Sequence, residues 1–562
     1  MSETEVAQRV TELADQYVAA YFDAFPHQAT LVGASNADHG RLPDISLEAR
    51  ALWEAKEDSL LESLRAIDAN ALAAASPAAT TYHFLSTVLE NAIAFRQCRM
   101  ELWNVSPTWT GWQAEMALLA NSQPVGTDAQ NQAAIRRFSE LPRYLDQEIA
   151  NLREGLRLGY SEPKHNVQSV IDQMDALLSA PIDDSPFVAM ASDSIASFRA
   201  EMRRLESDAL RPAITRYRDF LRDEYLPAAR EAIGVSANPE GPACYAVAVR
   251  YHATVDMSPE EVHRTGLEQM EKIRSEMTQI AQRSFATSDL DALLDALKTD
   301  RQYLMAGRED MLRLTQAAID RAREAVPQWF GIVPKAQVAV EPVAAFQEKS
   351  APGGFYNAPA EDGSRPGIYY INLYEADQQP RAGLESTAFH ETYPGHHLQG
   401  AIALERTGLH PIGRYIFLSG FGEGWGLYSE RLADEMGLFS DDIDRLGLLS
   451  AEAHRAARLV VDPGMHALGW SRQQAIDYML ANTALSRSSA ESEIDRYLAV
   501  PGQATSYMLG NLEIRRLRAM AEDSLGERFD IRTFHDRVLE DGAVPLSVLR
   551  AKIVRWVRET PR

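Results

Sequence analysis

Apolar residues recur at three- and four-residue intervals, with charged residues between them, along most of this chain. The pattern is clearest in four segments: 6–25, 133–160, 293–326 and 511–525. Two helix starts carry the capping-box spacing of a serine followed three residues later by glutamate or glutamine, at Ser258 and Ser471. This periodicity puts the apolar side chains on one face of each helix. The sequence therefore predicts a mainly α-helical fold.

Two short segments have the β-branched and aromatic residues typical of strands. They are 336–343 (AQVAVEPV) and 367–374 (GIYYINLY), and residues 353–367 between them are rich in turn formers, so we expect a loop there. A small sheet is therefore expected immediately before a histidine-rich segment. Residues 244–255 fit either a strand pair or a helix, because their periodicity favours neither.

The length of 562 residues suits a large helical body of two lobes. We place an N-terminal helical lobe at residues 1–240 and a metal-binding catalytic region at 241–562. No repeat or low-complexity linker marks this boundary, so one continuous domain is the alternative.

Charge and cysteine content limit the partners and the compartment. The chain has 80 acidic and 56 basic residues, a net charge of −24, which disfavours binding to nucleic acid or to anionic membranes. No segment approaches the roughly eighteen apolar residues of a membrane span, and the N-terminus lacks the pattern of a secretion signal. Two isolated cysteines, Cys98 and Cys244, suit a reducing cytoplasm, with a single disulfide between them as the alternative. We expect a soluble cytoplasmic protein.

A histidine-rich motif is the strongest functional signal. Residues 389–400 (FHETYPGHHLQG) hold His390, His396 and His397, and a second motif, GEGWGLYSERL, follows at 422–432. A hydrolytic zinc site takes three protein ligands and keeps an open position, and two histidines with one glutamate are a common set. We predict one zinc ion per chain, with Glu423 as the third ligand.

The spacing within the motif bears on which histidines bind. In an H-E-x-x-H helix, ligands four residues apart share a face. Pro394 removes a helical hydrogen bond and disfavours helix at Tyr393, so a break or bulge is expected here. A break would bring His396 close to His390, whereas an unbroken helix would leave His397 about 10 Å further along the same face. We favour His390 and His396, and keep His397 as the alternative ligand or a transition-state donor.

The remaining site residues are assigned by chemistry and by resemblance to helical zinc peptidases. Glu391 is the expected general base for the metal-activated water. Tyr507 and His466 are candidates for a second donor to the oxyanion, and Glu430 and Asp462 for orienting the metal-binding histidines.

Substrate contacts are predicted from two kinds of group. Main-chain groups around residues 367–372, at a sheet edge, are expected to hold an extended peptide. The guanidinium groups of Arg455, Arg458 or Arg515 are candidates to clamp a substrate carboxylate.

The motifs HETYPGHH (390–397) and EGWGLYSERL (423–432) resemble those of the bacterial domain-of-unknown-function family 885 and, more distantly, of gluzincin-type zinc metallopeptidases. Further segments that resemble this family run through most of the chain. Relative to H-E-x-x-H two residues are inserted, and Gly395-His396 matches the Gly-His with which related peptidase motifs end. The resemblance implies a zinc metallopeptidase or amidohydrolase with a channel between helical lobes and a small sheet at its floor, acting on short peptide or amide substrates.

Two other classes of protein are alternatives. A carboxylate-bridged di-iron helical protein needs two Glu-x-x-His pairs. The chain has Glu260 with His263 on a plausible helix, while Glu162 and His165 flank Pro163, which disfavours a helix. The other alternative is a non-catalytic helical metal-binding protein, against which Glu391 argues because only catalysis requires it.

Overall fold

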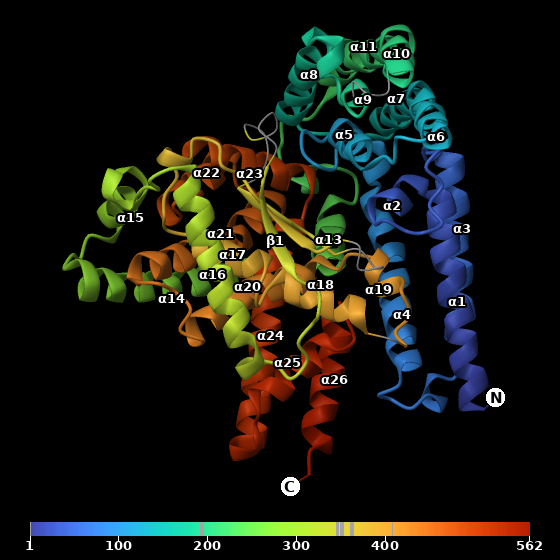
Figure 1. The fold of residues 1–562 in the computed structure, drawn as a ribbon. Helices are drawn as coiled ribbons and strands as arrows, with labels where there is room; N and C mark the ends of the chain where they lie inside the picture. Colours follow the sequence, from blue (N-terminus) through green and yellow to red (C-terminus); the bar gives the residue numbers. More distant parts are fainter. Residues whose placement is uncertain are drawn as a thin grey trace.

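The computed structural model describes residues 2–191, 196–343, 348, 353–359, 365–406 and 408–561. Helices dominate it, with one small sheet (Figure 1), which confirms the mainly α-helical fold. The N-terminal helices are α1 (Glu3–Ala24), α2 (Pro26–Leu31), α3 (Leu47–Arg65) and α4 (Pro77–Phe95). A second group, whose larger helices gather at the top of Figure 1, is α5 (Trp112–Ser122), α6 (Asp128–Ser139), α7 (Leu141–Leu158), α8 (Lys164–Ser179), α9 (Pro186–Ala189), α10 (Ala196–Leu205), α11 (Arg211–Phe220) and α12 (Leu226–Ala228).

The rest of the molecule carries the sheet and the candidate site. Its first helices are α13 (Gly241–Ala253), α14 (Pro259–Phe285), α15 (Leu290–Thr299) and α16 (Arg308–Trp329). After the sheet follow α17 (Leu384–Glu391), α18 (His396–Glu405), α19 (Ile412–Tyr415), α20 (Ser419–Glu435), α21 (Asp442–His466), α22 (Arg472–Asn482), α23 (Arg487–Ala499), α24 (Ser506–Leu525), α25 (Ile531–Leu539) and α26 (Leu546–Glu559).

The predicted helical segments are largely present, although residues 300–307 interrupt segment 293–326 between α15 and α16. Ser258 and Ser471 cap α14 and α22, each accepting a hydrogen bond from the backbone N–H three residues on. Segment 133–160 falls in α6 and α7, because a proline in the first turn of α7 starts a new helix there. The ambiguous segment 244–255 lies largely in the helix α13.

The sheet has three strands, β1 (Val338–Pro342), β2 (Gly354–Asn357) and β3 (Gly367–Ile371), in the order β1-β3-β2. Strand β1 is parallel to β3, whereas β2 is antiparallel to it. The sheet precedes the histidine-rich segment as predicted, but the loop expected over 353–367 was wrong in part, since it contains β2. Cross-strand packing explains this strand, because the ring of Phe355 stacks on that of Tyr370 at 5.1 Å.

Hydrophobic clusters join distant parts of the chain. The second helical group has a cluster of its own, built from residues between 42 and 229. Another cluster combines α1, α3 and α4 with α24, α25 and α26. The boundary at residue 240 stays a prediction.

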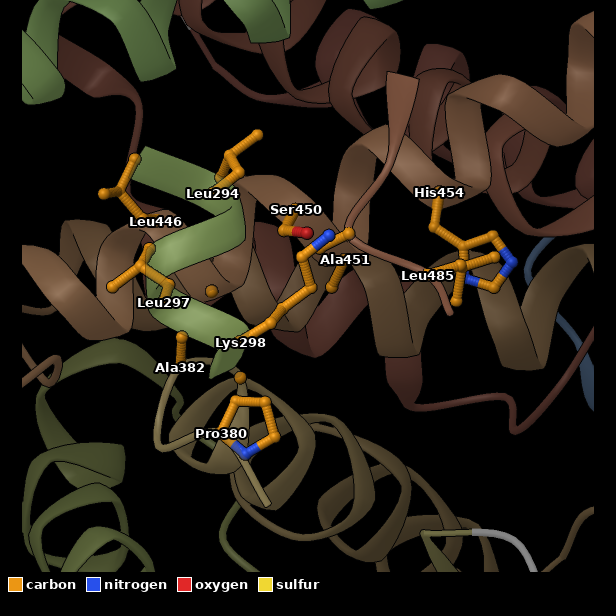
Figure 2. Close-up of a pocket in the computed structure, with 13 residues that line it drawn as sticks. Leu294, Leu297, Lys298, Pro380, Ala382, Leu446, Ser450, Ala451, His454 and Leu485 are labelled. Carbon is orange, nitrogen blue, oxygen red and sulfur yellow. The ribbon is translucent and has the colours of Figure 1, made fainter. Parts of the chain in front are cut away.

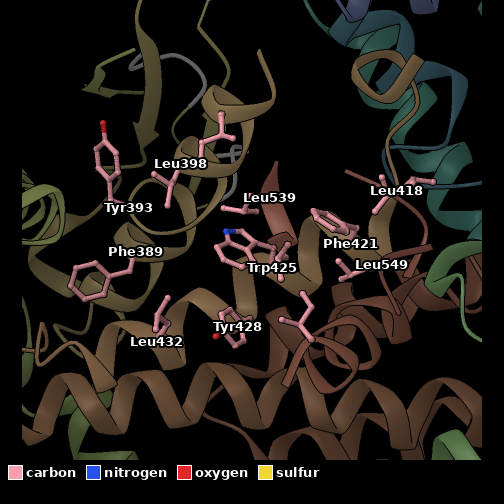
Figure 3. Packing of buried hydrophobic residues seen from close by; sticks show 14 of the residues in the cluster. Phe389, Tyr393, Leu398, Leu418, Phe421, Trp425, Tyr428, Leu432, Leu539 and Leu549 are labelled. Atoms are coloured by element: carbon pink, nitrogen blue, oxygen red, sulfur yellow. The ribbon is translucent and has the colours of Figure 1, made fainter. Parts of the chain in front are cut away.

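Helix α20 is divided into an apolar face and a face toward the candidate site. Phe421, Trp425, Tyr428 and Leu432 recur at intervals of three and four and are buried in the core (Figure 3). Helix α20 also approaches α24 so closely that a Cβ at Gly510 would lie 1.9 Å from the carbonyl oxygen of Gly420. Glycine at position 510 therefore allows the close packing of these two helices, which both carry site residues.

A disulfide joins Cys98, just after α4, to Cys244 in α13. The sequence favoured two isolated thiols, so the structure corrects that expectation in favour of the alternative. Among the helices that the structure describes, none combines the length and the apolarity needed to cross a membrane.

Candidate metal centre

The histidine motif is folded as two helices with a break between them. Helix α17 ends at Glu391 and α18 begins at His396, which confirms the break predicted from Pro394. The Tyr393–Pro394 peptide bond is cis. The indole N–H of Trp425 donates to the carbonyl oxygen of Pro394 at 2.9 Å. Trp425 of the motif at 422–432 therefore stabilises the break in the histidine motif.

The break brings three donor side chains together. Nε2 of His390 lies 3.5 Å from Oε2 of Glu423, and Nε2 of His396 lies 3.7 Å from the same oxygen. One ligand atom from each residue lies within 4.8 Å of the others. Within the described part of the chain, this is the only such group of three or more histidine, cysteine or acidic side chains.

The ring of His390 is fixed from two sides. Its Nδ1 donates to Oε1 of Glu430 at 2.8 Å, and the hydroxyl of Ser386 donates to the other Glu430 oxygen at 2.5 Å. Glu423 and Glu430 are seven residues apart and share one face of α20. Between them lies Gly426, where a Cβ would be 2.5 Å from Cε1 of His390. Only glycine leaves room for the imidazole across this helix.

The electrostatics of the group favour positive charge. Burial acts to lower the pKa of His390, but hydrogen bonds to Glu423 and Glu430 outweigh it and raise this pKa to about 10. Burial likewise acts to raise the pKa of Glu423, and the two histidines more than reverse this, so the carboxyl stays ionised. If the imidazoles were neutral, a bound cation would compensate the negative charges of Glu423 and Glu430 equally well.

The donor set fits zinc better than the harder cations. Two imidazole nitrogens and one carboxylate oxygen are typical zinc ligands, whereas Ca²⁺ and Mg²⁺ prefer oxygen alone. The carboxylate of Glu430 on the far nitrogen of His390 is the arrangement that orients metal-binding histidines in proteins. The residues present therefore fit one zinc ion.

Glu391 stands directly beside this group. Burial is the main cause that raises the pKa of its carboxyl, opposed by the charges of His396 and His390. It lines a cavity of about 770 Å³ together with His390, His396 and Glu423. The predicted general base and the predicted ligands thus face one space.

Strand β2 and two further helices contribute side chains to the walls of this cavity. Strand β2 contributes Phe355 and Tyr356, and α24 contributes Tyr507. Helix α21 contributes Arg455 and Arg458. Burial raises the pKa of the Tyr507 hydroxyl, and the charge of Glu423 adds to the effect, so this hydroxyl keeps its proton.

His397 lies away from the three donors. Its Nδ1 faces the hydroxyl of Tyr356 at 2.9 Å, and its Nε2 lies 3.1 Å from both the Ala336 carbonyl oxygen and the Tyr393 hydroxyl. Both nitrogens are thereby used in joining α18 to the sheet. The alternative of His397 as ligand or transition-state donor is corrected, because the break turns it away from His390.

His466 and Asp462 were wrongly assigned to the site. His466 is fully buried, with Nδ1 accepting from the Val235 N–H at 3.0 Å and Nε2 bonded to the Tyr497 carbonyl. Asp462 accepts from Tyr245 and from the backbone of Gly502. Both residues join α21 to its neighbours instead of facing the cavity.

Two of the predicted substrate contacts do not line the cavity. Residues 367–371 form the central strand β3, so the edge strand that lines the cavity is β2. Arg515 lies outside the lining and pairs with Glu452 at 3.4 Å. Sequence reasoning missed Ser386 and Gly426, although the spacing Glu423, Gly426, Glu430 on one helix face is a signal for the latter.

A smaller cavity of about 220 Å³ lies on another side of α21 (Figure 2). Leu294, Leu297 and Lys298 of α15 face Ser450 and His454 of α21 across it. None of the three metal-site donors lines it.

Together, the helical fold and the site define a helical protein with one His-His-Glu group beside a half-buried glutamate. A family model described as "Bacterial protein of unknown function (DUF885)" matches residues 26–553, and the chain belongs to this family. No match was found among curated proteins.

Two solved structures share the fold. One, described as "the putative lipoprotein from Colwellia psychrerythraea", is 28% identical, covers 99% of this chain and 100% of its own, and has a TM-score of 0.91. Another, "a putative lipoprotein of unknown function from Shewanella oneidensis", is 18% identical over 97% of this chain and 99% of its own, with a TM-score of 0.75.

These likenesses overturn the expected cytoplasmic localisation. Both proteins are described as lipoproteins, a class attached to membranes by lipid and not cytoplasmic. The Cys98–Cys244 disulfide agrees with this correction, because disulfides persist in oxidising compartments.

Proposed function

We propose that this chain is a zinc-dependent hydrolase of peptide or related amide bonds in short substrates. The observation that carries the proposal is the placement of Glu391 in one cavity with His390, His396 and Glu423. The likeness of the two motifs to those of gluzincin-type peptidases supports the same conclusion.

His390, His396 and Glu423 would hold the metal. When bound, zinc supplies a Lewis acid that polarises the substrate carbonyl and makes water a stronger acid. Glu430 and Ser386 hold the imidazole of His390 in the orientation that leaves Nε2 facing Glu423.

Glu391 moves the proton. Its carboxylate accepts a proton from the attacking water and then passes it to the nitrogen of the leaving amine. The hydroxyl of Tyr507 is the candidate donor to the oxyanion that forms on the substrate carbonyl.

The dimensions of the cavity favour short substrates. A volume of about 770 Å³ suits a ligand of a few residues. Strand β2, at the edge of the sheet, offers main-chain groups with which an extended peptide pairs.

The two alternatives, a di-iron helical protein and a non-catalytic metal-binding protein, have less support. Nδ1 of His263 bonds to the Val460 carbonyl, and His165 pairs with Asp495. Among the described residues, neither Glu-x-x-His pair belongs to a group of three or more side chains that could hold a metal. A non-catalytic metal-binding protein would have no use for Glu391 in the cavity wall.

The test separates metal binding from catalysis. Glu391→Gln is expected to keep its zinc and to lose hydrolysis of a mixed library of short peptides, followed by mass spectrometry. Turnover that survives this substitution would refute the role of Glu391 as general base.

A further inference from the structure

One wall of the candidate site is cationic, in a chain whose net charge is −24. Arg455 and Arg458, one turn apart on α21, both line the cavity that holds Glu391. His390, His396 and Glu423 line the same cavity, so both guanidinium groups share one space with the candidate metal ligands.

Arg458 is held rigidly but is only partly compensated. It is 6% exposed, its Nη2 lies 2.9 Å from Glu493, and its guanidinium lies 4.5 Å from the ring centre of Tyr507. Glu493 also pairs with Arg496 at 3.1 Å, so one carboxylate serves two guanidinium groups. Nη1 of Arg458 is buried and has no hydrogen-bond partner in the described structure.

Arg455 has still less compensation. Among the described residues, no carboxylate lies within the 4.0 Å of an ion pair with it, and its one hydrogen bond goes to the carbonyl oxygen of Ala451 at 3.2 Å. Its Nε is buried without a partner. Unpaired buried donors on a cationic group are costly unless a ligand satisfies them.

We infer that Arg455 and Arg458 bind a free carboxylate of the substrate next to the bond that is cleaved. A planar guanidinium suits a carboxylate because it offers two parallel N–H donors. The inference rests on the proposed function and names its substrate class: peptides with a free C-terminus, from which the last residue is removed.

The reaction then balances as a simple hydrolysis. The bond between the carbonyl carbon and the amide nitrogen of the last residue breaks, and the water oxygen bonds to that carbon. One water proton passes through Glu391 to the amine nitrogen. The products are a peptide shorter by one residue and the free amino acid, whose carboxylate is the group held by the arginines.

A binding assay tests this inference without requiring catalytic turnover. N-acetylated tripeptides are prepared as one library with free C-termini and another with C-terminal amides, and mixed with zinc-loaded full-length Glu391→Gln protein. Peptides retained on ultrafiltration are identified by mass spectrometry. We expect the free acids to be enriched about tenfold to hundredfold over the amides, the effect of a hydrogen-bonded charge pair.

Two variants of the Glu391→Gln protein test whether Arg455 causes this preference for free acids over amides. Arg455→Met should abolish it while amides are retained as before, whereas Arg515→Met, outside the cavity, should leave it unchanged. Equal retention of acids and amides, retention of neither, or an unchanged preference in Arg455→Met would overturn the inference. Because no bond is cleaved in this assay, the preference is measured even if the unsubstituted protein hydrolyses no peptide.

Discussion

Glu430 accepts a hydrogen bond from Nδ1 of His390 at 2.8 Å, which leaves Nε2 of the same ring facing Glu423. Burial acts to raise the pKa of Glu430, but the bond to His390 and the charge of Arg455 hold it below its ordinary value. The carboxylate is therefore ionised and only accepts, so Nδ1 of His390 carries a proton. Nε2 is the nitrogen left for a metal, which would replace the second proton that the raised pKa of this imidazole keeps on the ring.

The first prediction concerns this hydrogen bond. Glu430→Gln should weaken zinc binding by about 10- to 100-fold, because an amide no longer fixes the ring as an ionised carboxylate does. Competition with a chromogenic chelator measures the affinity. Glu435→Gln, near the end of the same helix, is the matched control and should bind zinc like the unsubstituted protein; equal loss in both variants would refute the role of Glu430.

The second prediction concerns the space under His390. Gly426→Ala places a Cβ 2.5 Å from Cε1 of His390, so either the ring or the helix must move. We expect loss of most bound zinc while the far-ultraviolet circular dichroism stays helical. Gly400→Ala, with its nearest neighbour at 3.9 Å, should keep zinc. Full zinc content in Gly426→Ala would show that the imidazole does not sit over this glycine.

The third prediction concerns the break in the histidine motif. Trp425→Phe removes the donor to Pro394 and leaves a buried carbonyl oxygen without it. The free energy of unfolding should fall by about 1–3 kcal/mol from this oxygen alone, with a further loss for the smaller ring. Urea unfolding measures this. Trp556→Phe, which is partly buried, should cost less, and an equal loss would argue against the bond to Pro394.

The fourth prediction concerns the disulfide. Cys98 and Cys244 are 146 residues apart, so their bond constrains a large loop of the unfolded chain. Reduction should lower the free energy of unfolding by about 2–5 kcal/mol. The Cys98→Ser/Cys244→Ser variant should be insensitive to dithiothreitol. Two free thiols in denatured, unreduced protein would contradict the bridge.

The sequence was sufficient for the local features of the site. A proline in the middle of the motif predicted the break between α17 and α18, and the capping boxes predicted two helix starts. The pairing of His390 with His396 followed from that break. These features depend on backbone chemistry within a few residues, which one sequence contains.

Long-range contacts could not be predicted in this way. His397 is adjacent to His396, but its partners Tyr356 and Ala336 belong to the sheet, and β2 is a strand only because it pairs with β3. His466 is a candidate for catalysis from the sequence, but in the structure its Nδ1 accepts a hydrogen bond from the backbone of Val235. Such partners come from folding and not from spacing.

Zinc content, measured by mass spectrometry of protein purified without chelators, tests the central claim most directly. We expect about one zinc per chain in the unsubstituted protein and in His397→Gln, and almost none in His396→Ala or Glu423→Ala, as a three-residue ligand set requires. Zinc retained in full by either alanine variant, a pair of iron ions, or no metal in the unsubstituted protein would contradict the account.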